Sequence, residues 1–155
     1  MTANTGNEWK ISIKNPLNDY EQRSGITINV NDLVEVENDH VGAMHYAMRW
    51  EGEKKFSTLR ILDGSEKALA GKKKLPSNAP KAITESGVWT NVLAVETRGV
   101  EPVDWIKGVD EFTVVSTGGT VYTEEIDFSD EWCEYCEKSE ESVGISNIEY
   151  RWSTV

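Results

Sequence analysis

Cys133 and Cys136 are the residues of this chain with the clearest capacity for chemistry. They are the only cysteines among 155 residues, and two residues separate them. Two thiolates at this spacing are typical of half a zinc site, which needs four Cys or His ligands in a tetrahedron. The remaining ligands would be His40 and His45, the only histidines in the sequence. A zinc site built from these four residues is therefore one hypothesis.

A thiol-redox pair is a second hypothesis for the same two cysteines. A redox thiol needs a lowered pKa, which a helix N-terminus or a nearby cation can supply. Here Glu131, Glu134 and Glu137 surround the pair, and their negative charges would raise the thiol pKa. The sequence favours a third interpretation, in which the two thiols are packed or half exposed and have no chemical role.

Motifs of the common enzyme classes are absent from the sequence. It contains no P-loop, no GxSxG nucleophile elbow, no HExxH zinc motif and no GxGxxG dinucleotide motif. The acidic residues between Asp127 and Glu141 are typical of a solvated surface, because nothing in the sequence places them in a pocket that would shift their pKa. We therefore expect a protein without catalytic activity and without a cofactor.

The net charge of −11 restricts the partners of this chain. A nucleic-acid-binding protein normally presents a basic face, so the charge argues against nucleic acid and favours other proteins as partners. No apolar run approaches the roughly 20 residues that span a bilayer, and the first residues lack the pattern of a signal or transit peptide. We expect a cytoplasmic location, with an organelle left open as an alternative.

Alternation of apolar and polar residues predicts a mostly β fold. Ile26, Ile28 and Val30 alternate with polar neighbours, which is the period of a half-buried strand. Capping residues at positions 129–130 and a glycine at Gly144 favour one short helix near residues 130–141. Further strands are predicted at residues 44–50, 56–62, 88–96, 111–116, 119–127 and 148–152. The expected fold class is an all-β sandwich or barrel-like domain with that one helix.

The first 24 residues are interpreted as an N-terminal arm, and residues 25–155 as a single β domain. Trp9, Ile11 and Ile13 alternate with polar residues and would form one apolar strand face. An exposed apolar strand is an aggregation hazard unless something covers it. The cover would be either the chain's own sheet or a neighbouring chain, and of the two we expect these three residues to dock on a partner protein.

Two stretches of the chain resemble one protein family. The sequence ETRGVEPVDW at residues 96–105 resembles the segment ECRGLEPVDF of the eukaryotic CXXC-motif-containing zinc-binding proteins. Residues 130–145 resemble that family's signature DWxDYDEKxxESVGI, and the spacing between the two segments is also similar. The resemblance covers residues 91–152 well, fades toward residue 26 and leaves residues 1–24 without a counterpart. The positions that carry the two signatures are Arg98, Gly99, Glu101, Pro102, Trp132, Tyr135, Ser142 and Gly144.

The first signature also has a purely structural interpretation. Gly99 permits a positive φ, and Pro102 fixes the next bend of the backbone. Arg98 and Glu101 flank this turn, where they would form an ion pair or bind a partner. The structural interpretation is the favoured one.

The resemblance implies an all-β fold of two related halves, one zinc ion held by two Cys-x-x-Cys pairs, and no established catalytic activity. This chain departs from that pattern at both pairs. The place of the first pair reads Glu51-Gly52-Glu53-Lys54, and no pair precedes Asn91. We therefore expect a divergent member of the family that lacks the zinc site.

A fold that is kept without its metal is most simply explained by the use of its surface. We expect a non-enzymatic interaction or accessory subunit of a larger eukaryotic protein assembly. The alternative is a zinc-binding protein with a rebuilt site that involves Cys133 and Cys136. A small thiol-redox protein is the third hypothesis.

Overall fold

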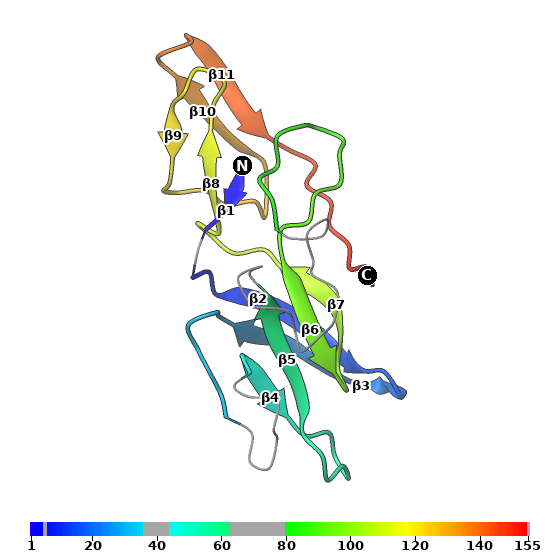
Figure 1. Ribbon diagram of the computed structural model, residues 1–155. Coiled ribbons are helices and arrows are strands. Elements are labelled where there is room, and N and C mark those ends of the chain that lie inside the picture. Colours follow the sequence, from blue (N-terminus) through cyan, green and yellow to red (C-terminus); the bar gives the residue numbers. More distant parts are fainter. Residues whose placement is uncertain (5, 36–43, 63–79, 155) are drawn as a thin grey trace.

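The computed structural model describes residues 1–4, 6–35, 44–62 and 80–154 (Figure 1). The strands in this part of the chain pair only in antiparallel fashion. None of the described residues is helical. The part of the chain that the structure describes therefore holds no helix that could cross a membrane. The prediction of an all-β fold is confirmed.

Two three-stranded sheets form one end of the molecule (Figure 1). In the first, β2 is the central strand between β3 and β7; in the second, β5 lies between β4 and β6. The turn from β2 to β3 is set by Asn15, whose side-chain oxygen accepts a hydrogen bond from the N–H of Leu17 at 3.0 Å. The six strands are β2 (Trp9–Asn15), β3 (Asn18–Ile28), β4 (Tyr46–Met48), β5 (Ser57–Leu62), β6 (Ala94–Arg98) and β7 (Glu101–Ile106).

A three-stranded sheet and a hairpin form the other end (Figure 1). The sheet has the order β1-β8-β9, and β10 and β11 pair only with each other. The ring of Tyr122 in β9 stacks edge-on against Trp132 in β10, with centroids 5.2 Å apart, and so joins the hairpin to the sheet. The strands are β1 (Thr2–Ala3), β8 (Phe112–Val115), β9 (Val121–Tyr122), β10 (Trp132–Cys136) and β11 (Glu141–Ile145).

One apolar core connects the two ends. Trp9 in β2 contacts Phe112 in β8 edge-on, with ring centroids 6.0 Å apart, and Phe112 in turn contacts Phe128 at 5.6 Å. Trp105 in β7 lies 6.2 Å from both Trp9 and Phe112. Burial of such large rings contributes most of the favourable free energy of folding that a small core can supply.

The predicted N-terminal arm is part of this core, and the interpretation of Trp9, Ile11 and Ile13 as partner-binding residues is wrong. Ile11 and Ile13 have no exposed surface, and Trp9 is 6% exposed. Their strand β2 pairs on both edges, with β3 and with β7. Because β3 runs without a break through residues 24 and 25, no domain boundary falls there. The alternation was identified correctly, but the strand is covered by the chain itself.

The predicted helix near residues 130–141 is a hairpin instead. Trp132 of β10 lies opposite Ile145 of β11, and Cys136 lies opposite Glu141. Trp132 and Cys136 are buried while the three residues between them are exposed. Two apolar residues four positions apart fit one face of a helix and one face of a strand equally well, so this spacing did not separate the two.

Several predicted strands are shorter or absent. The strands expected at residues 44–50 and 119–127 are only β4 (Tyr46–Met48) and β9 (Val121–Tyr122). Residues 88–93 are irregular, and the strand expected at 88–96 begins only at Ala94. Residues 148–152, where another strand is predicted, form no ladder. Both segments line two hollows of the molecule, which are described below, instead of pairing with a neighbouring strand.

Candidate functional site

The two thiols lie on one strand but face in opposite directions. Cys133 is exposed and Cys136 is buried, and both belong to β10. Successive side chains of a strand alternate between its faces, and a rise of about 3.3 Å per residue puts the two Cα atoms about 10 Å apart. A disulfide needs Cα atoms within about 7 Å of each other. The strand therefore does not bring the pair together for disulfide chemistry.

Hydroxyl groups surround the sulfur of Cys136. Its sulfur is 3.4 Å from the hydroxyl oxygen of Ser116 and 3.3 Å from that of Thr120. Hydrogen bonds from Ser116, Ser139 and Thr120 stabilise the thiolate more than burial disfavours it, and they lower the pKa of Cys136 to about 6. The side chain has no exposed surface. These contacts tie the turn between β8 and β9 to β10, which is a structural role.

The two histidines do not join the cysteines. His40 lies outside the described residues. His45 is buried next to β4, and its Nδ1 accepts a hydrogen bond from the backbone N–H of Ile61 at 2.8 Å. The strand β4, which begins at the next residue, lies at the end of the molecule opposite β10 (Figure 1). His45 is thus a structural side chain of the β4-β5-β6 sheet.

The residues present do not fit the zinc site that the resemblance implies. A tetrahedral site holds each sulfur at about 2.3 Å from the metal, and the only two thiols of the chain face apart. Residues 51–54, where the first family pair is expected, form an exposed stretch without cysteine. Within the described residues, no three His, Cys, Asp or Glu side chains gather around a common point.

Gly99 of the first signature lets the turn between β6 and β7 lie close to Ser57 at the start of β5. Gly99 has a φ of 71°, and a Cβ there would lie 2.3 Å from the hydroxyl oxygen of Ser57. Its carbonyl oxygen accepts a hydrogen bond from the indole N–H of Trp50 at 2.7 Å. Pro102 lies in β7, an edge strand of its sheet, where a missing N–H is tolerated.

The charged residues of that signature are exposed. Arg98 ends β6, and Glu101 begins β7 with its carboxylate 3.7 Å from the ammonium group of Lys14. A partly exposed pair of this kind contributes little to stability. The predicted alternatives of an Arg98–Glu101 ion pair or a partner contact stay a prediction.

The second signature builds the β10–β11 hairpin. Tyr135 lies opposite Ser142, and Cys133 lies opposite Gly144. A Cβ at Gly144 would approach the carbonyl oxygen of Trp132 to 3.0 Å, so the absence of a side chain lets the strands close up. The signature residues are therefore explained by packing and pairing.

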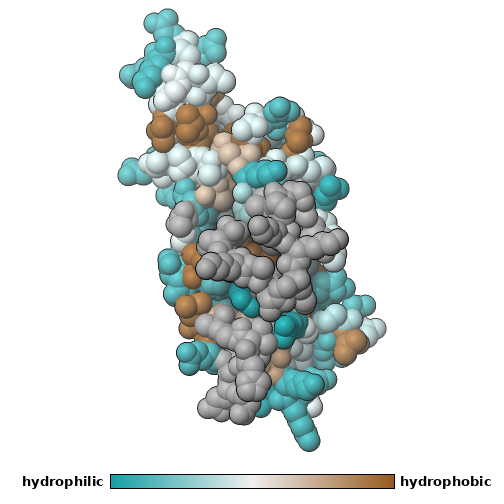
Figure 2. Space-filling view, in the orientation of Figure 1, coloured by the Kyte–Doolittle hydropathy of each residue, from teal (hydrophilic) through white to brown (hydrophobic). Residues whose placement is uncertain are grey.

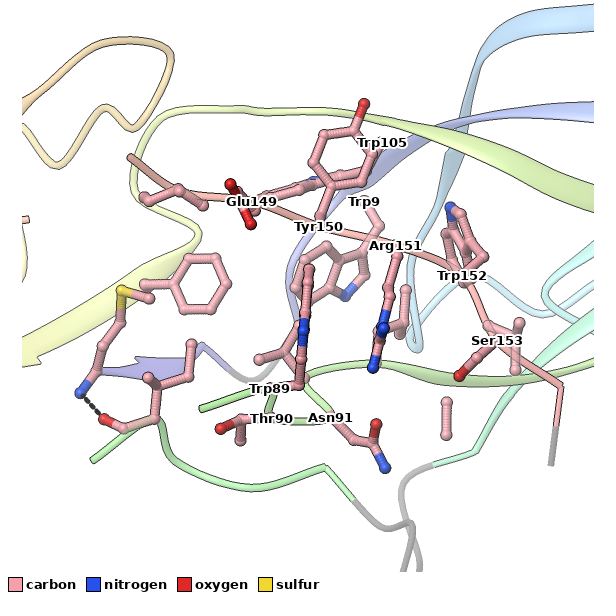
Figure 3. Close-up of a pocket in the computed structure, with 18 of the residues that line it drawn as sticks. Trp9, Trp89, Thr90, Asn91, Trp105, Glu149, Tyr150, Arg151, Trp152 and Ser153 are labelled. Atoms are coloured by element: carbon pink, nitrogen blue, oxygen red, sulfur yellow. Dashed lines mark hydrogen bonds between the residues drawn. The ribbon is translucent and has the colours of Figure 1, made fainter. Parts of the chain in front are cut away.

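An aromatic pocket of about 240 Å³ lies under the two irregular segments (Figure 3). Trp9 and Trp105 line it from the core, and Trp89 and Tyr150 line it from the segments above. The guanidinium of Arg151 stacks over the ring of Trp89 at 4.2 Å, and Figure 3 shows the two side chains together in the centre of the pocket. The Tyr150 hydroxyl donates to the Asp104 carboxylate and so fastens the C-terminal segment to β7.

A second hollow, which we call the acidic groove, adjoins this pocket and is larger, at about 720 Å³. Residues 83–89 line it, together with residues 114–117 from the end of β8 and residues 141–149 from β11 and beyond. On the coloured part of the face in Figure 2, most residues are hydrophilic or intermediate, and apolar residues gather in small groups. The groove was not found from the sequence. The apolar Val88–Trp89 pair directly after Gly87 is a signal of an apolar surface, but the same residues also fit the start of the strand predicted at 88–96.

The comparisons with known proteins agree with the resemblance. The sequence profile of the family described as "CXXC motif containing zinc binding protein, eukaryotic" matches residues 1–153. The match includes residues 1–24, so the expectation that they lack a family counterpart is wrong. The chain is also 40% identical over 70 residues to "UPF0587 protein CG4646" of Drosophila melanogaster. That alignment covers 44% of this chain and 42% of the length of the fly protein.

Two solved structures share the fold. "Hypothetical protein from plasmodium falciparum" matches with a TM-score of 0.70 at 23% identity, over 95% of this chain and 87% of that one. "Crystal Structure of C1orf123" matches with a TM-score of 0.67 at 19% identity, over 94% and 84% of the two chains. At these identities the likeness supports the fold alone. The profile match over nearly the whole length identifies the lineage: the chain belongs to the eukaryotic family of CXXC-motif-containing zinc-binding proteins.

Proposed function

We propose that the chain is a non-enzymatic interaction or accessory subunit of a larger eukaryotic protein assembly. The observation that carries this proposal is the acidic groove, where exposed apolar side chains lie beside carboxylates. Val88, Trp89 and Val115 are 54%, 51% and 55% exposed. Apolar side chains gathered at a concave surface with a polar rim are typical of protein interfaces.

Glu111 is an acidic residue with a raised pKa, and its position outside both hollows supports a non-enzymatic role. Burial raises the pKa of the Glu111 carboxyl, which is the kind of shift that catalytic acids use. This carboxylate accepts a hydrogen bond from the N–H of Gly108 at 3.1 Å, and Glu111 lines neither the pocket nor the groove. Its environment is that of a group that holds a loop.

Photocrosslinking in native cells tests the proposal. A photoreactive amino acid replaces Val115 in the groove, and in a control chain it replaces Tyr20, which is 98% exposed on β3. We expect irradiation to join the Val115 chain to a defined partner protein, and to give much less of the same product from the Tyr20 chain. If both chains stay at 17.4 kDa after irradiation, the proposal is wrong.

A further inference from the structure

The two edges of β8 are paired over different lengths. One edge pairs with β9 through Val114 and Val115, and the N–H of Ser116 closes the connection by donating to the carbonyl oxygen of Thr120 at 2.9 Å. The other edge pairs with the two-residue strand β1, which reaches no further along β8 than Thr113. Among the described residues, no strand pairs with this second edge where β8 passes through the acidic groove.

The backbone of Val115 faces the bare edge. The carbonyl oxygen of Glu111 accepts a hydrogen bond from the N–H of Asn4 at 2.9 Å, so Glu111 faces the side of β1. Alternate residues of a strand turn their backbone groups to the same side, which places Thr113 and Val115 on that side as well. Thr113 lies opposite Thr2, but Val115 has no ladder partner there among the described residues. Unpaired backbone groups of this kind are the template for an added strand.

The charges that line the groove are negative. Glu85, Glu141 and Glu149 are exposed and line it, and among the described residues that line it none is Lys, Arg or His. The amino group of Met1 also lies there but already donates to the carbonyl oxygen of Ile83 at 2.9 Å. The net charge of −11 adds to the negative potential of the groove.

We propose that the acidic groove binds an extended, basic segment of a partner protein, which pairs with the free edge of β8. This inference rests on the proposed function and specifies the chemistry of the partner. Hydrogen bonds to the backbone of Val115 hold the segment, and its alternate side chains reach opposite directions. Apolar side chains of the segment contact Val88 and Trp89, and the basic side chains between them meet the carboxylates.

Charge argues against the other occupants of such a groove. A second copy of this chain brings another −11 charges to the interface, and a nucleic acid brings phosphates. Both would repel the three carboxylates of the groove. A basic polypeptide is attracted to them, and its association is faster at low salt.

Three synthetic peptides of about eight residues test the inference with the full chain. The first alternates lysine and valine, the second alternates glutamate and valine, and the third is the first with alternate backbone nitrogens methylated. We expect the lysine–valine peptide to bind in a fluorescence anisotropy titration. The other two are expected to bind at least about tenfold more weakly, since one loses the charge attraction and the other loses the strand hydrogen bonds.

Hydrogen exchange locates the contact. The amide of Val115 is expected to exchange more slowly with the lysine–valine peptide, and to be unchanged with the methylated one. A triple variant lowers the groove charge and is expected to weaken binding of the lysine–valine peptide about tenfold: Glu85→Gln, Glu141→Gln, Glu149→Gln. A matched control removes three exposed carboxylates elsewhere and is expected to bind within about twofold of the unmodified chain: Glu51→Gln, Glu53→Gln, Glu124→Gln.

Several results would overturn the inference. These are equal affinity for all three peptides, no binding at millimolar peptide, or the same loss from both triple variants. Protection of Val115 that rises with protein concentration alone would assign the groove to a second copy. If the peptides fail while the photocrosslinked partner persists, only the basic-strand inference falls. If the peptides bind while the native chain captures no partner, the proposed function falls.

Discussion

Cys136 owes its properties to three hydroxyl neighbours. Its thiol has no exposed surface, yet hydrogen bonds from Ser116, Ser139 and Thr120 lower its pKa to about 6. The folded-state value lies below the ordinary value of 9.0, so the thiolate stabilises the fold. That contribution is complete above pH 9 and is lost as the pH falls through 6.

A thiol titration checks this environment. In a Cys133→Ser chain, Cys136 is the only thiol, and its thiolate absorbance is expected to rise with a midpoint near pH 6. Adding Ser116→Ala removes the largest cause of the shift and should move the midpoint to higher pH. A midpoint near 9 in the first chain would show that the hydroxyl groups do not stabilise the thiolate.

Gly99 is required by its conformation and by its surroundings together. Gly99 and Gly52 have φ values of 71° and 81°, but a Cβ would meet Ser57 at Gly99 and nothing within 4 Å at Gly52. Gly52→Ala is expected to cost about 1–2 kcal/mol of unfolding free energy from the backbone strain alone. Gly99→Ala should cost clearly more, because the Ser57 side chain must also move. Urea unfolding of both variants measures the difference, and equal losses would contradict the close approach.

At the scale of the elements, β2 is a central core strand, whereas the sequence predicts that it docks on a partner. Ile11 is fully buried in the centre of its sheet, whereas Lys10 on the opposite face is exposed. Ile11→Ala is expected to lower the unfolding free energy by about 2–5 kcal/mol, and Lys10→Ala by less than about 0.5 kcal/mol. Deletion of residues 1–24 should abolish cooperative unfolding. A stable, cooperatively unfolding deletion chain would restore the interpretation of an external arm.

The alternation of apolar and polar residues correctly predicts strands that have one apolar and one polar face. It does not predict elements that depend on tertiary contacts. Residues 56–62 and the hairpin of β8 and β9 were predictable, because apolar residues and turn glycines agree there. The hairpin of β10 and β11 was missed because its Glu-rich sequence favours a helix, and pairing with β11 overrides that preference. The groove was not predictable, since residues 83–89 and 141–149 are distant in sequence and meet only in the fold.

For the whole molecule, the small number of possible zinc ligands leads to a prediction about its metal content. The chain has two cysteines, and the strand that carries them turns one inward and one outward. We expect purified protein to contain well under one zinc per chain by elemental analysis. One zinc per chain that is lost in Cys133→Ser but kept in a surface variant such as Lys10→Ala would instead establish a rebuilt site.

The native size of the chain tests its role as an interaction subunit most directly. Tagged full-length protein is expressed in its own cells, and a gentle extract is separated by size exclusion at low salt. We expect the chain to elute well above its own 17.4 kDa, and the variant with Glu85, Glu141 and Glu149 changed to Gln to shift toward the monomer. The variant with Glu51, Glu53 and Glu124 changed to Gln should elute with the unmodified chain. Elution of the unmodified chain as a 17.4 kDa monomer would contradict its role as a subunit of a larger assembly.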